Sequence, residues 1–531
     1  MFIRLGAETR GYQDWLFIWL EAETRGYQDW LFISLEAETR VSYLQAKCQN
    51  EILFLFQSWA VSGVLLNMLG QGMVLSFPVV LLPGLKADDS TIKTDLETMS
   101  WLSSVVGLAC FPGYLISAFF MELWGRKTSH AMVILPGTLA WLLIYFATDV
   151  TTLMAGRILG GFTAGASTTL GAVIIGEYTS PQLRGMFLNL KTAAVCIGNT
   201  LVHIVGHFYT WRTVAIFGLV PHVISFGIIC TWPESPTWLA AKFKFEQSEK
   251  AWLWLRGDDQ NSRNEYGSLT KAQKQRISEI REKSSVQRHV VIFLQKFTRK
   301  DFLKPLLIIL FAAILLETCG RHIFPAYALQ IIEEISGDKS RTFYYTIIID
   351  LITTFSSMFS SALVRMLKRR TLLFVTGGAS IAVLMAICTY LYLSAMDVIS
   401  KDRAWLPVSM LMLYFLLANL GCTPIPLALL GEVFPVAHRG AGSAMSGLTL
   451  SICLMVALKV TPAMLESVKV YGTFAIFGVA MGLSLVVFYF ILPETKDRTL
   501  QEIEDYFNHG RFLSDKKVPG DDEENTTMLK I

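Results

Sequence analysis

Charged residues are scarce in this chain. Only 17% of its 531 residues are charged and 53% are hydrophobic, whereas roughly a quarter of the residues of an ordinary soluble domain are charged. This balance excludes a typical soluble domain and predicts a membrane protein.

Signatures of several other chemistries are also missing. The sequence has no GxxxxGK[ST] phosphate-binding loop, so ATP-driven transport is not expected. Its histidines lack metal-ligand spacing, and His203 and His207, four residues apart, are expected to be packed or hydrogen-bonded. Seven of eight cysteines lie in apolar runs, where a reduced thiol behaves as a small hydrophobe, so no disulfide framework is expected. We expect neither an enzyme nor a cofactor, and the basic stretch near 270–289 should contact anionic lipid rather than nucleic acid.

Long apolar runs, in contrast, are abundant. Each is long enough to cross about 30 Å of hydrocarbon as a helix. There are twelve, at about 58–85, 99–121, 128–148, 151–176, 186–210, 213–232, 305–332, 342–364, 371–396, 404–430, 440–465 and 470–492. Lipid-facing open sheets would leave backbone groups unpaired, so we predict an all-α membrane protein of twelve transmembrane helices in two six-helix halves.

The domain organisation follows from these runs. We predict an N-terminal segment 1–50, a first half 51–239, a cytoplasmic helical linker 240–303, a second half 304–507 and a disordered tail 508–531. Residues 7–36 hold two fifteen-residue copies that differ only at Trp19 and Ser34, which indicates a recent duplication or a gene-model error. The copies carry charges throughout, so they are not a signal peptide, and segment 1–50 is expected to be disordered if it is native.

Basic residues indicate the orientation. The linker is rich in Lys and Arg, and the short loops with Arg126 and Lys127, and with Lys368 to Arg370, lie on the same side. Positive loops remain in the cytoplasm. Both termini are therefore expected to be cytoplasmic, and the protein to be multi-pass, with the plasma membrane as the expected location.

The two halves repeat each other. "ELWGRK" after span two corresponds to "RMLKRR" after span eight, "GEYTSPQLRG" to "GEVFPVAHRG", and "PESPTWL" to "PETKDRTL". Transporters are commonly built from such repeats, with a mid-membrane solute site between halves that rock against each other.

These motifs also concentrate charge at one end of the spans. In both halves a Glu precedes an Arg by seven positions. We predict interdomain ion pairs that close the cytoplasmic side, formed by Glu122, Arg126, Lys127, Arg157, Glu177, Arg184, Glu234, Glu432, Arg439 and Glu494. The alternative is that these are snorkelled charges that fix helix depth.

Over residues 52–507 the chain resembles the sugar porter branch of the major facilitator superfamily, and most closely the insect facilitated trehalose transporters. The resemblance rests on "GRK" at Gly125, "GRILGGFTAG" at Gly156, "PIP" at Pro424 and the motifs quoted above. It implies twelve helices and passage of a hexose or disaccharide down its gradient.

The expected solute contacts depart from the family. Aligned on Gly320, Glu317 replaces a family glutamine and His322 replaces an asparagine. By the resemblance, the solute-binding candidates are Thr192, Glu317, Arg321, His322, Thr353 and Asn419. The scaffold motifs are therefore kept better than the solute contacts.

Three ionisable residues within one apolar run require an explanation. A charge costs about 3 kcal/mol at a helix centre, so Glu317, Arg321 and His322 should face a cavity or pair with each other. Gly320 and Pro325 would permit a helix break there, Glu317 could pair with Arg321, and Asp350 could pair with Arg321 across spans. Three readings remain: a sugar site, a site for another polyol or a charged compound, and a structural pair in a non-transporting relative or solute sensor.

The first span holds no acidic residue in the stretch from Leu65 to Gly84. Proton-linked members of the family typically carry an Asp there. Facilitated diffusion is therefore favoured, although Glu317 or Asp350 could serve as the titrating group of a proton-linked carrier.

Overall fold

Helices account for nearly the whole of this computed structural model. It describes residues 27–88, 90–258, 260, 262–267, 269–271, 300–399, 405–432, 439–494, 496 and 506. For residues 27–50, 52, 181–182, 300–302, 361, 365, 430–432 and 439–443 the backbone alone is described.

Twelve helical segments are long and apolar enough to cross a membrane. The first half contains α2 (Tyr27–Ser76) with α3 (Pro78–Lys86), α4 (Leu96–Trp124), α5 (Arg126–Phe146), α6 (Val150–Tyr178), α7 (Pro181–Phe208) and α8 (Trp211–Thr231). The second contains α13 (Lys300–Thr318) with α14 (Ile323–Ser336), α15 (Thr342–Met366), α16 (Arg369–Ala395), α17 (Trp405–Gly421) with α18 (Pro424–Glu432), α19 (Arg439–Ser467) and α20 (Lys469–Ile491). The prediction of twelve spans is confirmed.

The outer faces of these helices are apolar. Large side chains such as Phe355 and Phe490 are 68% and 76% exposed. An outward apolar surface of this kind suits contact with lipid, where backbone groups must be satisfied within each helix.

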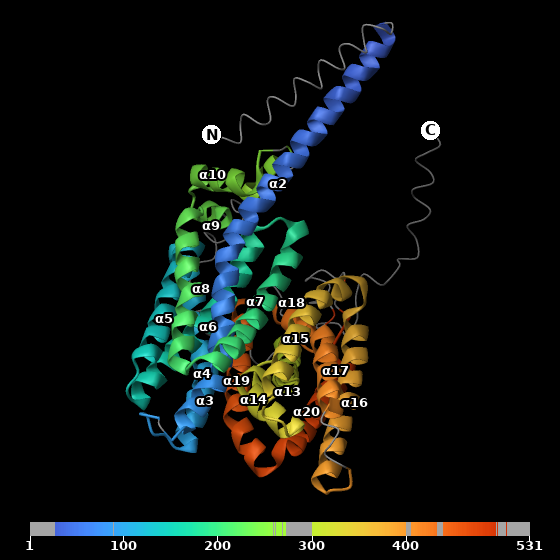
Figure 1. The fold of residues 1–531 in the computed structure, drawn as a ribbon. Helices are drawn as coiled ribbons and strands as arrows, with labels where there is room; N and C mark the ends of the chain where they lie inside the picture. Colours follow the sequence, from blue (N-terminus) through green and yellow to red (C-terminus); the bar gives the residue numbers. More distant parts are fainter. Residues whose placement is uncertain are drawn as a thin grey trace, which may run out of the picture.

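The bundle has two distinct ends (Figure 1). One carries the short helices α9 (Pro236–Ala241) and α10 (Phe245–Arg256), and we call it the α10 end. The other holds α3 and the turns that follow α5, α7 and α14, and we call it the α3 end.

The segment before the first span differs from its expectation. Helix α2 begins at Tyr27, so residues 27–50, expected to be disordered, are helical and continuous with the span. Because this stretch contains neither Gly nor Pro, nothing in it interrupts the helix. Of the linker predicted at 240–303, the structure describes residues 240–258, 260, 262–267, 269–271 and 300–303, while 272–299 lie outside the described part.

Span seven is broken, as Gly320 led us to expect. Helix α13 ends at Thr318, Gly320 adopts φ +85°, and α14 starts at Ile323. Glycine is the residue that takes this left-handed conformation without strain. The break leaves polar residues 319–322 outside regular helix, midway along the span.

Candidate functional site

A cavity lies between the two halves at the break in span seven. Its empty volume is about 570 Å³, a figure that includes space open to solvent. The first half contributes Leu75 from α2 and three α7 residues, Val195, Cys196 and Asn199. The second half contributes Cys319, Gly320, Arg321, His322, Phe324, Pro325, Asp350, Thr353, Phe415, Asn419 and Thr423.

Four of the six candidates predicted for solute contact line this cavity: Arg321, His322, Thr353 and Asn419. Glu317 is not among the lining residues, and its side chain is buried, at 3% exposed. Thr192 is partly buried and is not among the lining residues. The sequence missed Asn199, which stands seven residues, or two helical turns, after Thr192 on α7.

Glu317 pairs with His322 rather than with Arg321. Nδ1 of His322 lies 2.9 and 3.0 Å from the two carboxylate oxygens of Glu317. The predicted Glu317–Arg321 pair required an unbroken helix, in which residues four apart share a face. The break at Gly320 removes that register and turns His322 back over the acid.

Asp350 also pairs with a histidine. Its Oδ2 lies 2.6 Å from Nδ1 of His203 on α7, and Nε2 of His203 lies 3.0 Å from the Pro325 carbonyl. The suggested Asp350–Arg321 contact is therefore wrong, because an imidazole from the other half occupies the acid. Both ring nitrogens of His203 are therefore engaged, one by a carboxylate and the other by a backbone carbonyl.

Arg321 lacks such a partner. Among the described residues its guanidinium forms no ion pair, because Glu317 and Asp350 are each engaged by a histidine. A five-donor cation thus remains available at the cavity wall.

Polar contacts join the halves between the cavity and the α3 end. Tyr327 donates to the Leu458 carbonyl at 2.9 Å and so accepts from Ser103 of the first half at 2.7 Å. Ser100 donates to the Lys459 carbonyl, and the ring of His207 stacks on Phe343 with centroids 3.9 Å apart. Together with the His203–Asp350 pair, these contacts close the α3 end.

Arg157 belongs to this α3 side and not to the predicted cytoplasmic set. It lies near the start of α6 and donates to the carbonyls of Leu102 and Val74 at 2.8 and 2.7 Å. The sequence placed it wrongly because span four runs from the α3 end to the α10 end, which puts its seventh residue far from Arg126.

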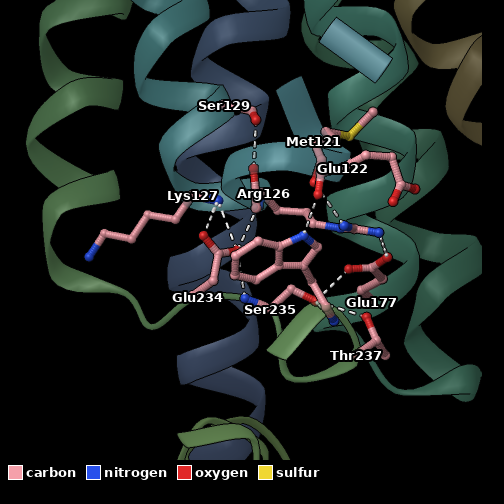
Figure 2. A network of polar contacts seen from close by, with 11 residues as sticks. Met121, Glu122, Arg126, Lys127, Ser129, Glu177, Glu234, Ser235 and Thr237 are labelled. Carbon is pink, nitrogen blue, oxygen red and sulfur yellow. Dashed lines mark hydrogen bonds and ion pairs between the residues drawn. The ribbon is translucent and has the colours of Figure 1, made fainter. Parts of the chain in front are cut away.

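At the α10 end, a carboxylate caps helix α5 (Figure 2). Oε1 of Glu234 accepts the backbone N–H groups of Arg126 and Lys127, at 2.7 and 3.1 Å. A negative charge at a helix N-terminus satisfies free donors and opposes the helix dipole. Gly125 adopts φ +87° before this cap, and an added Cβ would clash with the Glu234 carboxylate. Glycine is therefore required there.

Arg126 links three elements of the first half. Its guanidinium contacts the Glu177 carboxylate at 2.7 Å and the Met121 carbonyl at 3.1 Å, while Ser235 donates to the other Glu177 oxygen (Figure 2). Trp238 of α9 donates to the Glu122 carbonyl at 3.1 Å. The motifs thus fasten α4, α5, α6 and α9 to one another.

The second half repeats the cap. Glu494 accepts the backbone N–H groups of Arg369 and Arg370, both at 3.1 Å. Lys127 and Arg370 also correspond, because each side chain donates to a carbonyl at the end of the sixth helix of its half, Trp232 and Leu492. The internal repeat read from the sequence is therefore present in three dimensions.

These pairs differ from the predicted interdomain set. The described pairs of Arg126, Glu177, Glu234 and Glu494 each join elements of one half, and Arg184 is exposed without an ion pair in the described part of the chain. The side chains of Glu432 and Arg439 lie outside the described residues. Sequence spacing identified charges at a common end, but it does not define which half each charge contacts.

Helix α10 is tied to the bundle by Arg256. Its guanidinium donates to the Thr179 carbonyl at 2.6 Å and contacts Glu265 at 3.2 Å. Burial lowers the pKa of Arg256 below its usual value, and Glu265 offsets part of that effect. Gln57 of α2 adds a hydrogen bond to the Leu255 carbonyl at 3.0 Å.

The profile of the family described as "Sugar (and other) transporter" matches residues 73–507. The chain belongs to the sugar transporter family. Facilitated trehalose transporters of Bombyx mori and Polypedilum vanderplanki are 28% and 27% identical to it. The alignments cover 80% and 78% of this chain and 81% and 80% of those proteins.

Solved structures show the same fold. One is the proton:xylose symporter XylE of the major facilitator superfamily, bound to 6-bromo-6-deoxy-D-glucose. It superposes with a TM-score of 0.65 at 18% identity, and the match covers 86% of this chain and 99% of that one. An inward-open form from E. coli gives a TM-score of 0.65 at 17% identity, covering 85% and 99%. The twelve-helix architecture of this sugar transporter family member is thereby confirmed.

Proposed function

We propose that this protein is a facilitative sugar transporter for a hexose or a trehalose-like disaccharide, which works by alternating access. The observation that carries the proposal is the cavity between the halves. Asn199, Thr353, Asn419 and Thr423 present amide and hydroxyl groups in it, and Phe324 and Phe415 supply apolar faces. Neutral donors and acceptors beside aromatic rings suit a polyhydroxylated ring.

Asn199 gives this argument a specific acceptor. Its side chain is 7% exposed, and its Oδ1 is buried without a hydrogen-bond partner among the described residues. A buried unpaired acceptor costs about 1–3 kcal/mol. A sugar hydroxyl in the cavity would satisfy it.

The contacts around the cavity describe one state of the cycle. Hydrogen bonds between the halves close the α3 end, and we assign the α10 end, with its basic loops, to the cytoplasm. The reverse state requires the pairs His203–Asp350 and Ser103–Tyr327 to separate while the α10 ends approach.

The surroundings of Arg157 support uniport. Its guanidinium donates to backbone carbonyls, and the first span supplies no carboxylate that could exchange a proton beside it. A proton-linked carrier is the second candidate, favoured by the buried contact between two titratable side chains, His203 and Asp350, that joins the halves.

Uptake of labelled glucose and trehalose in oocytes that express the full chain tests the proposal. We expect saturable uptake of at least one sugar that a protonophore leaves unchanged, and that Asn199→Leu reduces. Uptake abolished by the protonophore would favour the proton-linked candidate. No uptake by protein shown to be at the cell surface would refute sugar transport and point to a sensor or a different solute.

A further inference from the structure

We infer that the cavity prefers a sugar that carries a carboxylate, such as a hexuronate, and that Arg321 binds this group. The inference rests on the proposed function and specifies its substrate class. Its starting point is the unequal pairing of charges around the cavity.

Each acid near the cavity has its own donor. Glu317 is held by Nδ1 of His322 through both oxygens, and Asp350 by Nδ1 of His203 at 2.6 Å. The second ring nitrogen of His203 is occupied by the Pro325 carbonyl. Neither carboxylate needs Arg321, and neither lies within ion-pair distance of it among the described residues.

Arg321 lies in the break in span seven, where no acid pairs with it among the described residues. It follows Gly320 in the break between α13 and α14, where both helices stop and the backbone turns. An arginine at membrane depth without an anion is costly unless it reaches water or a ligand. Here it lines a cavity that contacts both halves and contains several polar side chains.

The chemistry of the guanidinium selects the ligand. Its planar donors match a carboxylate in a two-bond arrangement that lysine or a neutral amide does not reproduce. From the first half, Asn199 offers an unpaired acceptor, and Thr353 and Asn419 of the second half add polar groups. A ring with hydroxyls on one side and a carboxylate on the other would satisfy both walls.

Binding of D-glucuronate, D-glucuronamide and D-glucose to the purified full-length protein tests this. Glucuronamide has the shape of glucuronate without its charge. We expect glucuronate to bind roughly tenfold to a hundredfold more tightly than glucuronamide, in line with a charge-assisted hydrogen-bond pair. Arg321→Gln should abolish this difference, and Arg321→Lys should retain part of it.

Lys250→Gln, which removes an exposed cation on α10, is the matched control and should leave the preference unchanged. Equal binding of glucuronate and glucuronamide by the parent, with glucose bound, would overturn the inference while the proposed function stands. Failure of the folded parent to bind any of these sugars or trehalose would overturn both. If Arg321→Gln does not fold, the parent comparison and Arg321→Lys decide.

Discussion

Replacing Asp350 by Asn should shift the protein toward the state that is open at the α3 end. In the structure, Asp350 on α15 and His203 on α7 are 5% and 3% exposed and bridge the halves at 2.6 Å. Asn cannot carry the negative charge of this pair. A hydrogen bond to a charged group contributes about 1.5–3 kcal/mol, and a loss of about 2 kcal/mol changes a population ratio roughly thirtyfold.

The shift can be measured as a distance between the halves. Spin labels at Lys86 and Val398, both exposed at the α3 end of different halves, would report it in a variant without native cysteines. We expect the ratio of long to short separations to rise by roughly one and a half orders of magnitude in Asp350→Asn. The control is Asp338→Asn, which removes an acid at the same end whose carboxylate, in the described part of the chain, contacts its neighbours Ser340 and Arg341. Identical distance distributions for parent and Asp350→Asn would refute the closure argument.

Three further predictions concern the helix ends. Gly125→Ala should lower the free energy of unfolding by about 1–3 kcal/mol, because φ is +87° and the methyl group meets Glu234, and thermal unfolding in detergent measures this. Glu494→Gln should destabilise the second half by about 1 kcal/mol, as Glu234→Gln should the first, because each loses a charged helix cap; unchanged melting temperatures would contradict the shared role. Hydrogen bonds from Thr152 lower the pKa of Asp149, so its contribution to stability is present above about pH 4 and is lost as pH falls through the folded-state pKa. Melting temperatures between pH 3 and 6 should therefore depend less steeply on pH in Asp149→Asn.

The helices and their repeat were predictable because lipid imposes a length and an apolar composition on every span. The break at Gly320 followed from the same physics, since a glycine beside three ionisable residues indicates a non-helical turn. The caps by Glu234 and Glu494 were visible as repeated motifs, but their role was not. The sequence suggested interdomain pairs, whereas both carboxylates cap helices of their own half.

The pairing of buried charges could not be predicted because it depends on contacts distant in sequence. His203 and Asp350 are 147 residues apart, and His203 offered no sign of an acidic partner. Glu317 and His322 are close in sequence, yet their contact exists only because the helix breaks between them. Arg157 was predicted at the wrong end of the bundle. Span four begins at the α3 end, so a residue near its start lies at that end and not beside Arg126.

Counterflow into proteoliposomes that contain the purified full chain tests transport most directly. Vesicles loaded with unlabelled glucose, trehalose or glucuronate, with no proton gradient, would be diluted into trace amounts of the same labelled sugar. Alternating access by a uniporter predicts a transient accumulation of label for at least one sugar, reduced by Asn199→Leu. Absence of accumulation for all three, from protein that is folded and reconstituted, would contradict the account.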